Sequence, residues 1–377
     1  MNAAFDFDAM RRYPDLEADN LFAVDASDRL ILDEAASALT SDTKLAVIND
    51  HYGALTLGAI AMHDLSGVRV HQDALSGEQA LRFNAKAEQL EALYENHALD
   101  AELLQGATVV LMQLPKSLDE LDDFAAAIAH FASADVVVFA GGRIKHMTPA
   151  MNDVFKRYFG RVDVSLARQK SRVLIVREPI ADASAPTIRT EQHRDLGLTL
   201  AATGSTFAGT KVDIGTRALL KVLAKAKPDA ELAIDLGCGT GVLAAALASA
   251  RPELRVIATD QSAAAVSSAT HTMELNGLSA RVTVVRDDGL DTQPDDSADL
   301  IVLNPPFHIG AVVHTGLALR LFEDAARVLR PGGELWTVFN SHLGYRQALA
   351  RIVGPTELVT HNEKFMVTVS TKNKADS

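Results

Sequence analysis

The chain has 377 residues, of which 48% are hydrophobic, and a formal net charge of −13. This length exceeds one ordinary core and predicts two domains of about two hundred residues each. The acidic balance excludes a general nucleic-acid coat, because non-specific affinity for phosphate depends on Lys and Arg. The apolar stretches are too short to span a bilayer, so no membrane partner is expected.

The N-terminus and the cysteine content indicate where the protein is located and whether it holds a metal. The chain begins M-N-A-A-F-D-F-D, which lacks the basic flank and apolar centre of a signal peptide. The single Cys238 permits no internal disulfide, and the sequence contains neither H-E-x-x-H nor paired C-x-x-C. We therefore expect a cytoplasmic protein, a monomer, with no metal site.

The first half alternates short β-branched runs with longer helical patterns, starting with L-A-V-I-N-D at Leu45. This alternation is the signature of βα units on a mainly parallel sheet. Its last third is basic: from Arg143 to Arg177 there are nine Lys and Arg against two acids, a local charge of +7. Such a run is often only a solvated face. We nevertheless expect it to hold phosphate, through Arg143, Lys145, Lys156 and Arg157.

A segment without periodicity, containing two prolines, lies near the middle of the chain and indicates a linker. We place a first domain at residues 1–180, the linker at 181–192 and a second domain at 193–377. The second domain repeats the pattern of the first, which suggests a duplication. In this alignment Asn49–Tyr52 stands opposite Asp235–Cys238, and Gln113–Pro115 stands opposite Asn304–Pro306. The first copy is therefore expected to keep the fold and to lack the chemistry.

The second half contains D-L-G-C-G-T-G at Asp235, between an apolar strand and a helical run. Glycines at 237, 239 and 241 allow a sharp turn and close approach of a ligand. The spacing does not match the dinucleotide pattern G-x-G-x-x-G. The acidic Asp235 would repel a pyrophosphate, whereas S-adenosylmethionine carries an ammonium and a sulfonium. The loop therefore predicts S-adenosylmethionine as the cofactor, held by Asp235, Gly237, Gly239 and Gly241.

Further acidic residues end the next two strands. V-I-A-T-D ends at Asp260, about twenty residues after the loop, where a carboxylate can accept from a ribose diol. V-V-R-D-D-G ends at Asp287 and Asp288, and either of them is a candidate acceptor for the adenine amino group.

The run L-N-P-P-F-H, Leu303 to His308, follows another apolar strand. The Pro-Pro pair makes a stiff loop that cannot continue the sheet. Asn304 Oδ1 and a backbone carbonyl can accept both hydrogens of an exocyclic amine, and rigid acceptors set in advance lower a barrier. A base in a duplex is not approachable in line, so it must be extruded or single-stranded.

Together, D-L-G-C-G-T-G, A-T-D and L-N-P-P-F-H resemble class I S-adenosylmethionine-dependent N-methyltransferases. S-T-F-A-G-T-K-V-D-I-G-T (205–216) and F-N-S-H-L-G-Y (339–345) are similar to the bacterial ribosomal RNA guanine-N2 methyltransferases. The second of these segments favours the large-subunit (23S) member of that family over the small-subunit (16S) member.

The resemblance implies two tandem Rossmann-like α/β domains, the first degenerate, and methyl transfer to N2 of a guanine in ribosomal RNA. It also implies that Asn304 and the Pro305 backbone bind the amine and that Phe307 stacks on the base. The implied cofactor pocket contains Phe207, Asp235, Gly237, Asp260 and Asp288, with Asn304 beside it.

Two other interpretations stay open at this point. The same asparagine-proline chemistry can serve adenine N6 in nucleic acid or a protein glutamine side chain. A non-catalytic RNA-binding assembly factor can also keep the cofactor fold. An intact glycine loop together with Asn304 argues against the second of these interpretations.

Overall fold

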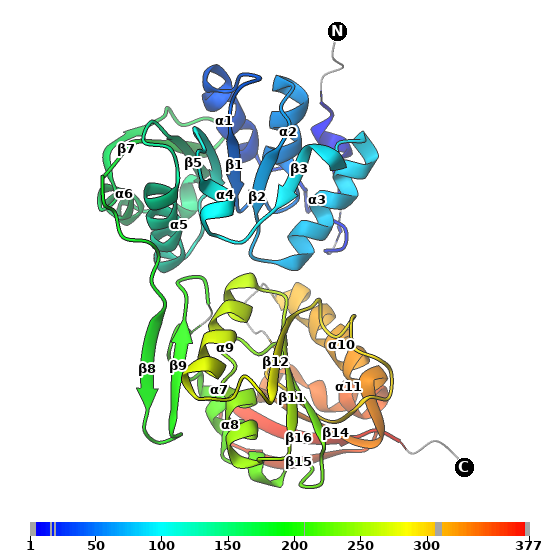
Figure 1. The fold of residues 1–377 in the computed structure, drawn as a ribbon. Helices are drawn as coiled ribbons and strands as arrows, with labels where there is room; N and C mark the ends of the chain where they lie inside the picture. Colours follow the sequence, from blue (N-terminus) through cyan, green and yellow to red (C-terminus); the bar gives the residue numbers. More distant parts are fainter. Residues whose placement is uncertain (1–4, 16, 19, 207, 306–310, 374–377) are drawn as a thin grey trace. The chain divides into compact units, whose positions relative to one another are not determined.

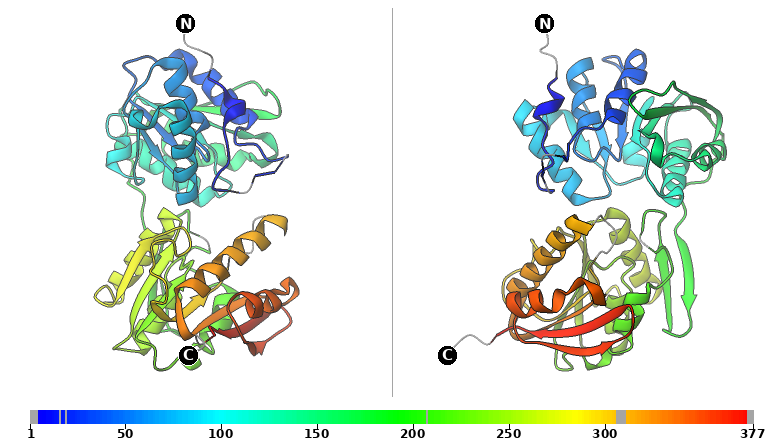
Figure 2. Two further views of the ribbon diagram at one scale, coloured as in Figure 1. Left: turned by 90° about the vertical axis from the view of Figure 1, so that its right-hand side faces the viewer. Right: turned by 180° about the vertical axis from the view of Figure 1, so that it is seen from behind.

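The chain forms two compact units, residues 1–187 and residues 188–377. The computed structural model describes residues 5–15, 17–18, 20–206, 208–305 and 311–373. Within each unit, a seven-stranded sheet is flanked by helices on both faces (Figures 1 and 2). The predicted α/β class and its repetition are both confirmed.

The elements of the first unit follow one another in a regular βα alternation. They are η1 Phe7–Ala9, α1 Ala26–Ala35, η2 Ala36–Ala38, β1 Leu45–Ile48, α2 Ala54–His63, β2 Val68–His71, α3 Leu75–Glu88, η3 Glu91–Leu93, β3 Tyr94–Asn96, α4 Ala101–Leu104, β4 Val109–Gln113, α5 Leu118–Phe131, β5 Val137–Arg143, η4 Ile144–His146, α6 Pro149–Lys156, β6 Phe159–Val164 and β7 Ser171–Pro179.

The second unit begins with an antiparallel hairpin and then repeats the same alternation. Its elements are β8 Arg189–His193, β9 Leu198–Ala202, α7 Ile214–Leu220, η5 Leu223–Lys225, β10 Leu232–Leu236, α8 Val242–Ala250, β11 Arg255–Asp260, α9 Ala263–Leu275, β12 Val282–Arg286, β13 Ala298–Leu303, α10 Ala311–Val328, β14 Leu329–Asn340, η6 Ser341–Leu343, α11 Tyr345–Ile352, β15 Thr356–His361 and β16 Phe365–Thr371. Strand β8 starts inside the range that the sequence assigns to a linker.

The two sheets have the same topology. The strand order is β3-β2-β1-β4-β5-β7-β6 in the first unit and β12-β11-β10-β13-β14-β16-β15 in the second. In each sheet the first five strands of this order are parallel, and the last two pair antiparallel. Element by element, the sheet of the second unit therefore has a counterpart in the first.

The central strands β1, β4, β10 and β13 are buried on both faces, which explains their continuous apolar runs. In β10, Ala233 packs with α8 and α9, while Ile234 packs with α10 and α11. Two core layers result, one on each face of the sheet. The loops that carry polar residues leave from the carboxyl ends of the parallel strands, which is where ligands bind in open α/β sheets.

Candidate cofactor and catalytic site

The loop between β10 and α8 has the backbone that its glycines predict. Gly237, Gly239 and Gly241 have φ values of 69°, 55° and 75°, a region that favours glycine. The amides of Gly237 and Cys238 both donate to the carbonyl of Thr259, at 2.9 Å each, and so tie the loop to the end of β11.

The three glycines serve different purposes. A Cβ built on Gly237 or Gly239 would meet no atom of the described residues within 4 Å, so the loop faces open space at these two positions. A Cβ on Gly241 would lie 2.8 Å from Met273 Cε. Gly241 therefore allows α8 to pack on α9, while Gly237 and Gly239 leave room for a ligand.

Asp235 is buried at the end of β10. Its Oδ2 accepts a hydrogen bond from the amide of Ala244 at 2.9 Å, in the first turn of α8. Burial, with a smaller contribution from the charge of Asp260, raises the pKa of Asp235 to about 7. The carboxyl group therefore caps the helix, and its protonation state changes near neutral pH.

Asp260 lies at the end of β11 and holds the glycine loop. Its Oδ2 accepts from the amide of Gly239 at 3.0 Å, and its Oδ1 accepts from the amide of Ser262 at 3.0 Å. An ionised carboxylate has about four acceptor sites. Asp260 can therefore hold the loop and still accept from a further donor.

Asp287 and Asp288 follow β12 and differ in their surroundings. Asp287 accepts from the amide of Thr292 and, at 2.7 Å, from its hydroxyl, so it closes its own turn. Asp288 Oδ2 forms an ion pair with Arg320 Nη2 at 2.9 Å. Both aspartates are buried.

Asn304 directly follows β13, the strand that pairs with β10. Its Nδ2 donates to Thr216 Oγ1 at 2.9 Å and to Asp213 Oδ2 at 3.3 Å. Its Oδ1 is buried and has no hydrogen-bond partner among the described residues. Such an orphaned acceptor is uncommon in a protein interior and requires an explanation.

The remaining residues of the predicted site lie partly outside the described residues. Pro305 is described and is buried. Phe307 and its neighbours 306–310 lie outside the described residues, as does Phe207. The predicted stacking face and one predicted wall of the cofactor pocket therefore stay predictions.

Sequence reasoning missed two functional candidates, Asp213 and Thr216. They lie about ninety residues before Asn304, within the D-I-G-T run that served only as a family resemblance. Asp213 also has an ordinary role, because its Oδ2 accepts from the amide of Gly215 at 2.8 Å and caps α7. An N-cap signal was therefore readable in the sequence, but its contact with Asn304 was not.

The first unit keeps the backbone of the glycine loop with only one of its glycines. Asn49, His51 and Gly53 have φ values of 61°, 57° and 98°. The amide of Asn49 donates to the carbonyl of His71 at 2.9 Å, as Gly237 does to Thr259. Asn49 thus matches Gly237, and His51 matches Gly239.

This match corrects the alignment expected from the sequence, which placed Asn49 opposite Asp235 and is wrong by two residues. The physical cause is that two non-glycine residues adopt left-handed conformations, which the sequence does not signal.

The side chains around this loop of the first unit differ from those around the glycine loop of the second unit. Sheet register places Gln72 where the second unit has Asp260, and its amide donates to the carbonyl of Gly77 at 3.0 Å. Tyr52 donates its hydroxyl to Asp15 at 2.6 Å, and the guanidinium of Arg12 lies 4.7 Å from the centroid of the Tyr52 ring. The N-terminal segment thus packs beside the loop.

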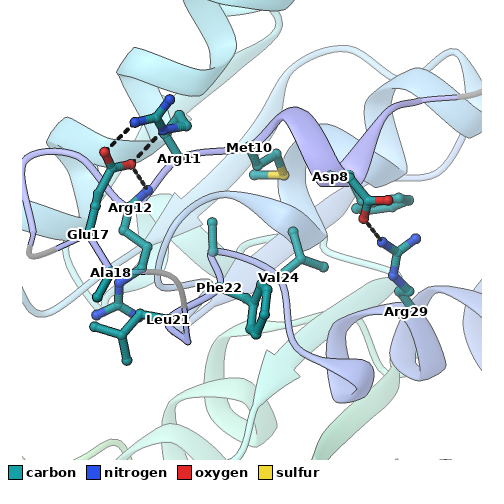
Figure 3. Close-up of a pocket in the computed structure, with 12 residues that line it drawn as sticks. Asp8, Met10, Arg11, Arg12, Glu17, Ala18, Leu21, Phe22, Val24 and Arg29 are labelled. Carbon is teal, nitrogen blue, oxygen red and sulfur yellow. Dashed lines mark hydrogen bonds and ion pairs between the residues drawn. The ribbon is translucent and has the colours of Figure 1, made fainter.

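A cavity of about 610 Å³ lies along that N-terminal segment (Figure 3). Its arginines are paired within its own wall: Arg11 Nε donates to Glu17 at 2.6 Å, and Arg29 contacts Asp8 at 2.7 Å. We assign no ligand to it.

The basic segment of the first unit is less free than its sequence suggests. Five of its six arginines reach acidic partners, most of them distant in sequence: Arg143–Asp25, Arg157–Asp122, Arg161–Asp163, Arg168–Asp33 and Arg177–Asp163, at 2.7 to 3.6 Å. Lys145 and Lys156 are exposed and form no ion pair with a described residue. Phe159 is 1% exposed and belongs to the core, so it offers no stacking surface.

Membrane spans and metal clusters are both missing from the part of the chain that the structure describes. None of the helices there is long and apolar enough to cross a membrane. Within the same residues, no group of three or more His, Cys, Asp or Glu side chains is placed to hold a metal ion.

Known proteins resemble the chain over nearly its whole length. Residues 2–180 match the RLMG N-terminal domain, and residues 197–369 match the Methyltransferase small domain. Proteins named ribosomal RNA large subunit methyltransferase G are 33% identical in Streptomyces avermitilis, over 95% of each chain, and 31% identical in Shewanella amazonensis, over 96% of each chain. The relative in Pseudomonas aeruginosa is 35% identical, over 94% of this chain and 95% of its own.

One solved structure has a similar fold over both units. It is the T. thermophilus 16S rRNA N2 methyltransferase in complex with AdoMet and guanosine, with a TM-score of 0.75 and 19% identity, covering 93% of this chain and 92% of that one. At this identity the likeness concerns the fold.

Proposed function

We infer that this chain, which belongs to the ribosomal RNA large subunit methyltransferase G family, transfers a methyl group from S-adenosylmethionine to N2 of a guanine in 23S ribosomal RNA. The observation that carries this proposal is the buried Oδ1 of Asn304, which has no hydrogen-bond partner in the part of the chain that the structure describes. A carboxamide oxygen held in this way can accept a hydrogen bond from a bound ligand, and an exocyclic amine has the N–H groups to donate one.

Asn304 and Pro305 are proposed to receive the amine. The N2 lone pair of guanine is delocalised into the ring and is a weak nucleophile. Acceptance of its two hydrogens by Asn304 Oδ1 and the Pro305 carbonyl localises the lone pair and aims it at the methyl group. Because both acceptors stand in a rigid turn, little reorganisation is needed during the reaction. The N–H proton released on methylation passes to solvent, so no base of tuned pKa is required.

The cofactor is proposed to lie over the glycine loop. When bound, S-adenosylmethionine supplies a methyl group activated by a positively charged sulfur. The open space at Gly237 and Gly239 fits its close approach, and Asp260 is placed to accept from its ribose. Asp288 is proposed as the adenine contact in preference to Asp287, because the hydrogen bonds of Asp287 with Thr292 serve its own turn.

The contact with RNA is proposed to involve both units. Phe307 would stack on the extruded guanine. In the first unit, Lys145 and Lys156 are the best-placed members of the predicted basic set, because Arg143 and Arg157 already face Asp25 and Asp122. We also propose a cytoplasmic monomer, and sedimentation of the purified protein would test its oligomeric state.

Transfer of labelled methyl to purified RNA tests the function. We expect 23S RNA from a strain lacking this protein to accept label from the wild-type protein, and 16S RNA and DNA to accept none. Wild-type 23S RNA, already modified, should accept little. Label on DNA or on a glutamine-containing protein would favour the alternative amines, and no label on any substrate would favour an assembly factor.

A further inference from the structure

We propose that Asp213 and Thr216 are positioning residues that present Asn304 Oδ1 to the target amine, and that Gly215 keeps this oxygen free. The proposal rests on the proposed function of Asn304. It assigns a role to the D-I-G-T run, which lies outside both the cofactor loop and the proline loop.

The contacts fix which way the amide faces. A carboxylate can only accept hydrogen bonds, so the Asn304 atom that faces Asp213 must be the nitrogen. Thr216 Oγ1 takes a second hydrogen bond from the same nitrogen at 2.9 Å. With both hydrogens of Nδ2 engaged, the amide cannot flip without breaking both hydrogen bonds, and Oδ1 is held in one direction.

The positioning residues are themselves held by α7. Asp213 is the N-cap residue of α7. Its Oδ2 accepts hydrogen bonds from the amides of Gly215 at 2.8 Å and Thr216 at 3.3 Å. Thr216 is 6% exposed and lies in the first turn of the same helix. The rotamer of Asn304 is therefore coupled to a helix terminus rather than to a mobile side chain.

The first unit contains a similar arrangement, in which an amide side chain contacts the first turn of an earlier helix. Gln113 stands in the place of Asn304, as the pairing of Ile48 with Met112 and of Leu236 with Leu303 requires. Asp25 caps α1 as Asp213 caps α7, so Asp28 and Ser27 are the counterparts of Thr216 and Gly215. Gln113 Nε2 donates to Asp28 and, at 3.0 Å, to Ser27 Oγ.

Ser27 Oγ also lies 3.2 Å from Gln113 Oε1 and 2.9 Å from Asp25 Oδ1, so its single hydrogen is shared between these two acceptors. Gly215 is the counterpart of Ser27 and has no side chain to offer such a donor. The space there is also small: a Cβ on Gly215 would lie 3.4 Å from Asn304 Oδ1 and 3.1 Å from Phe365 Cε1. Within one chain, the same site thus occurs with a hydroxyl beside its amide oxygen and, among the described residues, without one.

The test compares Thr216→Val, Thr216→Ser and Asp213→Ser in the full-length protein. Valine keeps the shape of threonine without the acceptor, whereas serine restores the acceptor. Serine at position 213 still caps α7 but is too short to reach Asn304. Removal of one hydrogen bond to Asn304, from a hydroxyl in Thr216→Val and from a carboxylate in Asp213→Ser, predicts a kcat lower by roughly tenfold in each variant. Thr216→Ser should stay near wild type, and KM and cofactor affinity should not change.

Ser27→Ala provides a control in the first unit, because it removes a hydroxyl that contacts the Gln113 amide and should leave kcat unchanged. The side-chain amide of Asn304 is observed separately by nuclear magnetic resonance on protein labelled at asparagine. Its signal is assigned as the one that is missing in Asn304→Ala. Solvent exchange of the Asn304 Nδ2 protons should be faster in Thr216→Val than in the wild type.

The outcomes separate the two proposals. If wild-type protein methylates no guanine, the proposed function fails, while the exchange of the Nδ2 protons still reports on the positioning residues. If Thr216→Val keeps the wild-type kcat, or shows unchanged exchange, the positioning role is overturned. A fall in kcat that Thr216→Ser does not restore, or that follows an equal fall in cofactor affinity, also overturns it, because the residue would then be structural.

Discussion

Gln113 and Asn304 stand at the ends of equivalent strands of the two sheets, and each turns its amide nitrogen toward the first turn of an earlier helix. Of these two amides, only that of Asn304 has an oxygen without a partner among the described residues. The difference depends on the helix turn as well as on the amide. In the first unit, the Ser27 hydroxyl lies beside the oxygen, and Asp28 accepts from the nitrogen of a side chain that is longer by one methylene.

Replacement of Asn304 by alanine should abolish most methyl transfer and leave the cofactor in place. We expect kcat to fall by roughly two to three orders of magnitude, the range for removal of one preorganised polar group. Single-turnover rates and calorimetric cofactor affinity would measure the two effects separately. Gln113→Ala is the matched control and should leave the rate unchanged. An equal fall in cofactor affinity in Asn304→Ala would make the residue structural.

Asp260→Ala should weaken binding of S-adenosylmethionine. Asp260 is proposed to accept from the ribose, and it also orders the loop through the amide of Gly239. A charge-assisted hydrogen bond is worth about 1.5 to 3 kcal/mol, so calorimetry should show roughly a tenfold to 150-fold rise in Kd. Gln72→Ala, at the matching position of the first unit, should bind the cofactor normally, and residues 1–187 alone should bind none. Binding by that fragment would contradict the degeneracy of the first unit.

The cofactor loop was predictable from sequence because its chemistry is local. Glycines in D-L-G-C-G-T-G favour left-handed backbone, and a strand end about twenty residues later supplies Asp260. The matching loop of the first unit was aligned two residues out, because Asn49 and His51 adopt the same backbone without glycine.

Contacts between distant segments were not predictable. Thr216 meets Asn304 across 88 residues of sequence. The acids that pair with the basic segment are also remote: Asp33 lies 135 residues from Arg168. A run of positive charge read from sequence therefore overestimates the charge that is free to bind phosphate.

Lys145 and Lys156 should contribute to RNA affinity through phosphate. Reversal of both to glutamate should weaken binding and flatten the slope of log affinity against log salt by roughly 0.7 to 0.9 for each phosphate that is no longer neutralised. Filter binding of 23S RNA fragments at several salt concentrations measures this slope. Lys44→Glu with Lys86→Glu changes the net charge equally, at exposed positions outside the basic segment, and should alter the slope less. Equal slopes in the two double variants would show that the segment is only a solvated face.

Asp235 should make the stability of the second unit depend on pH. Its pKa is about 7 in the folded protein, well above the ordinary value for aspartate. The folded state therefore binds this proton more tightly than the unfolded chain does. The stabilisation is fully present below about pH 4 and disappears as the pH rises through about 7. Asp235→Asn can keep the bond to Ala244 and should remove this part of the slope, as measured by urea unfolding without cofactor.

The same carboxyl group should link cofactor affinity to pH in the opposite direction. The proposed ligand brings positive charge near Asp235 and favours its ionised form. With a pKa of about 7, roughly one tenth of the carboxyl groups are ionised at about pH 6, so the observed Kd should fall roughly fivefold to tenfold between about pH 6 and 7.5. In Asp235→Asn the Kd should be higher and flat over this range.

Asp50→Asn is the control for this pH dependence, because Asp50 caps α2 in the first unit, where burial raises its pKa to about 6. The substitution should change stability but not the slope of the cofactor Kd against pH, since the first unit is expected to bind no cofactor. A wild-type Kd that is independent of pH would mean that Asp235 serves only to cap α8.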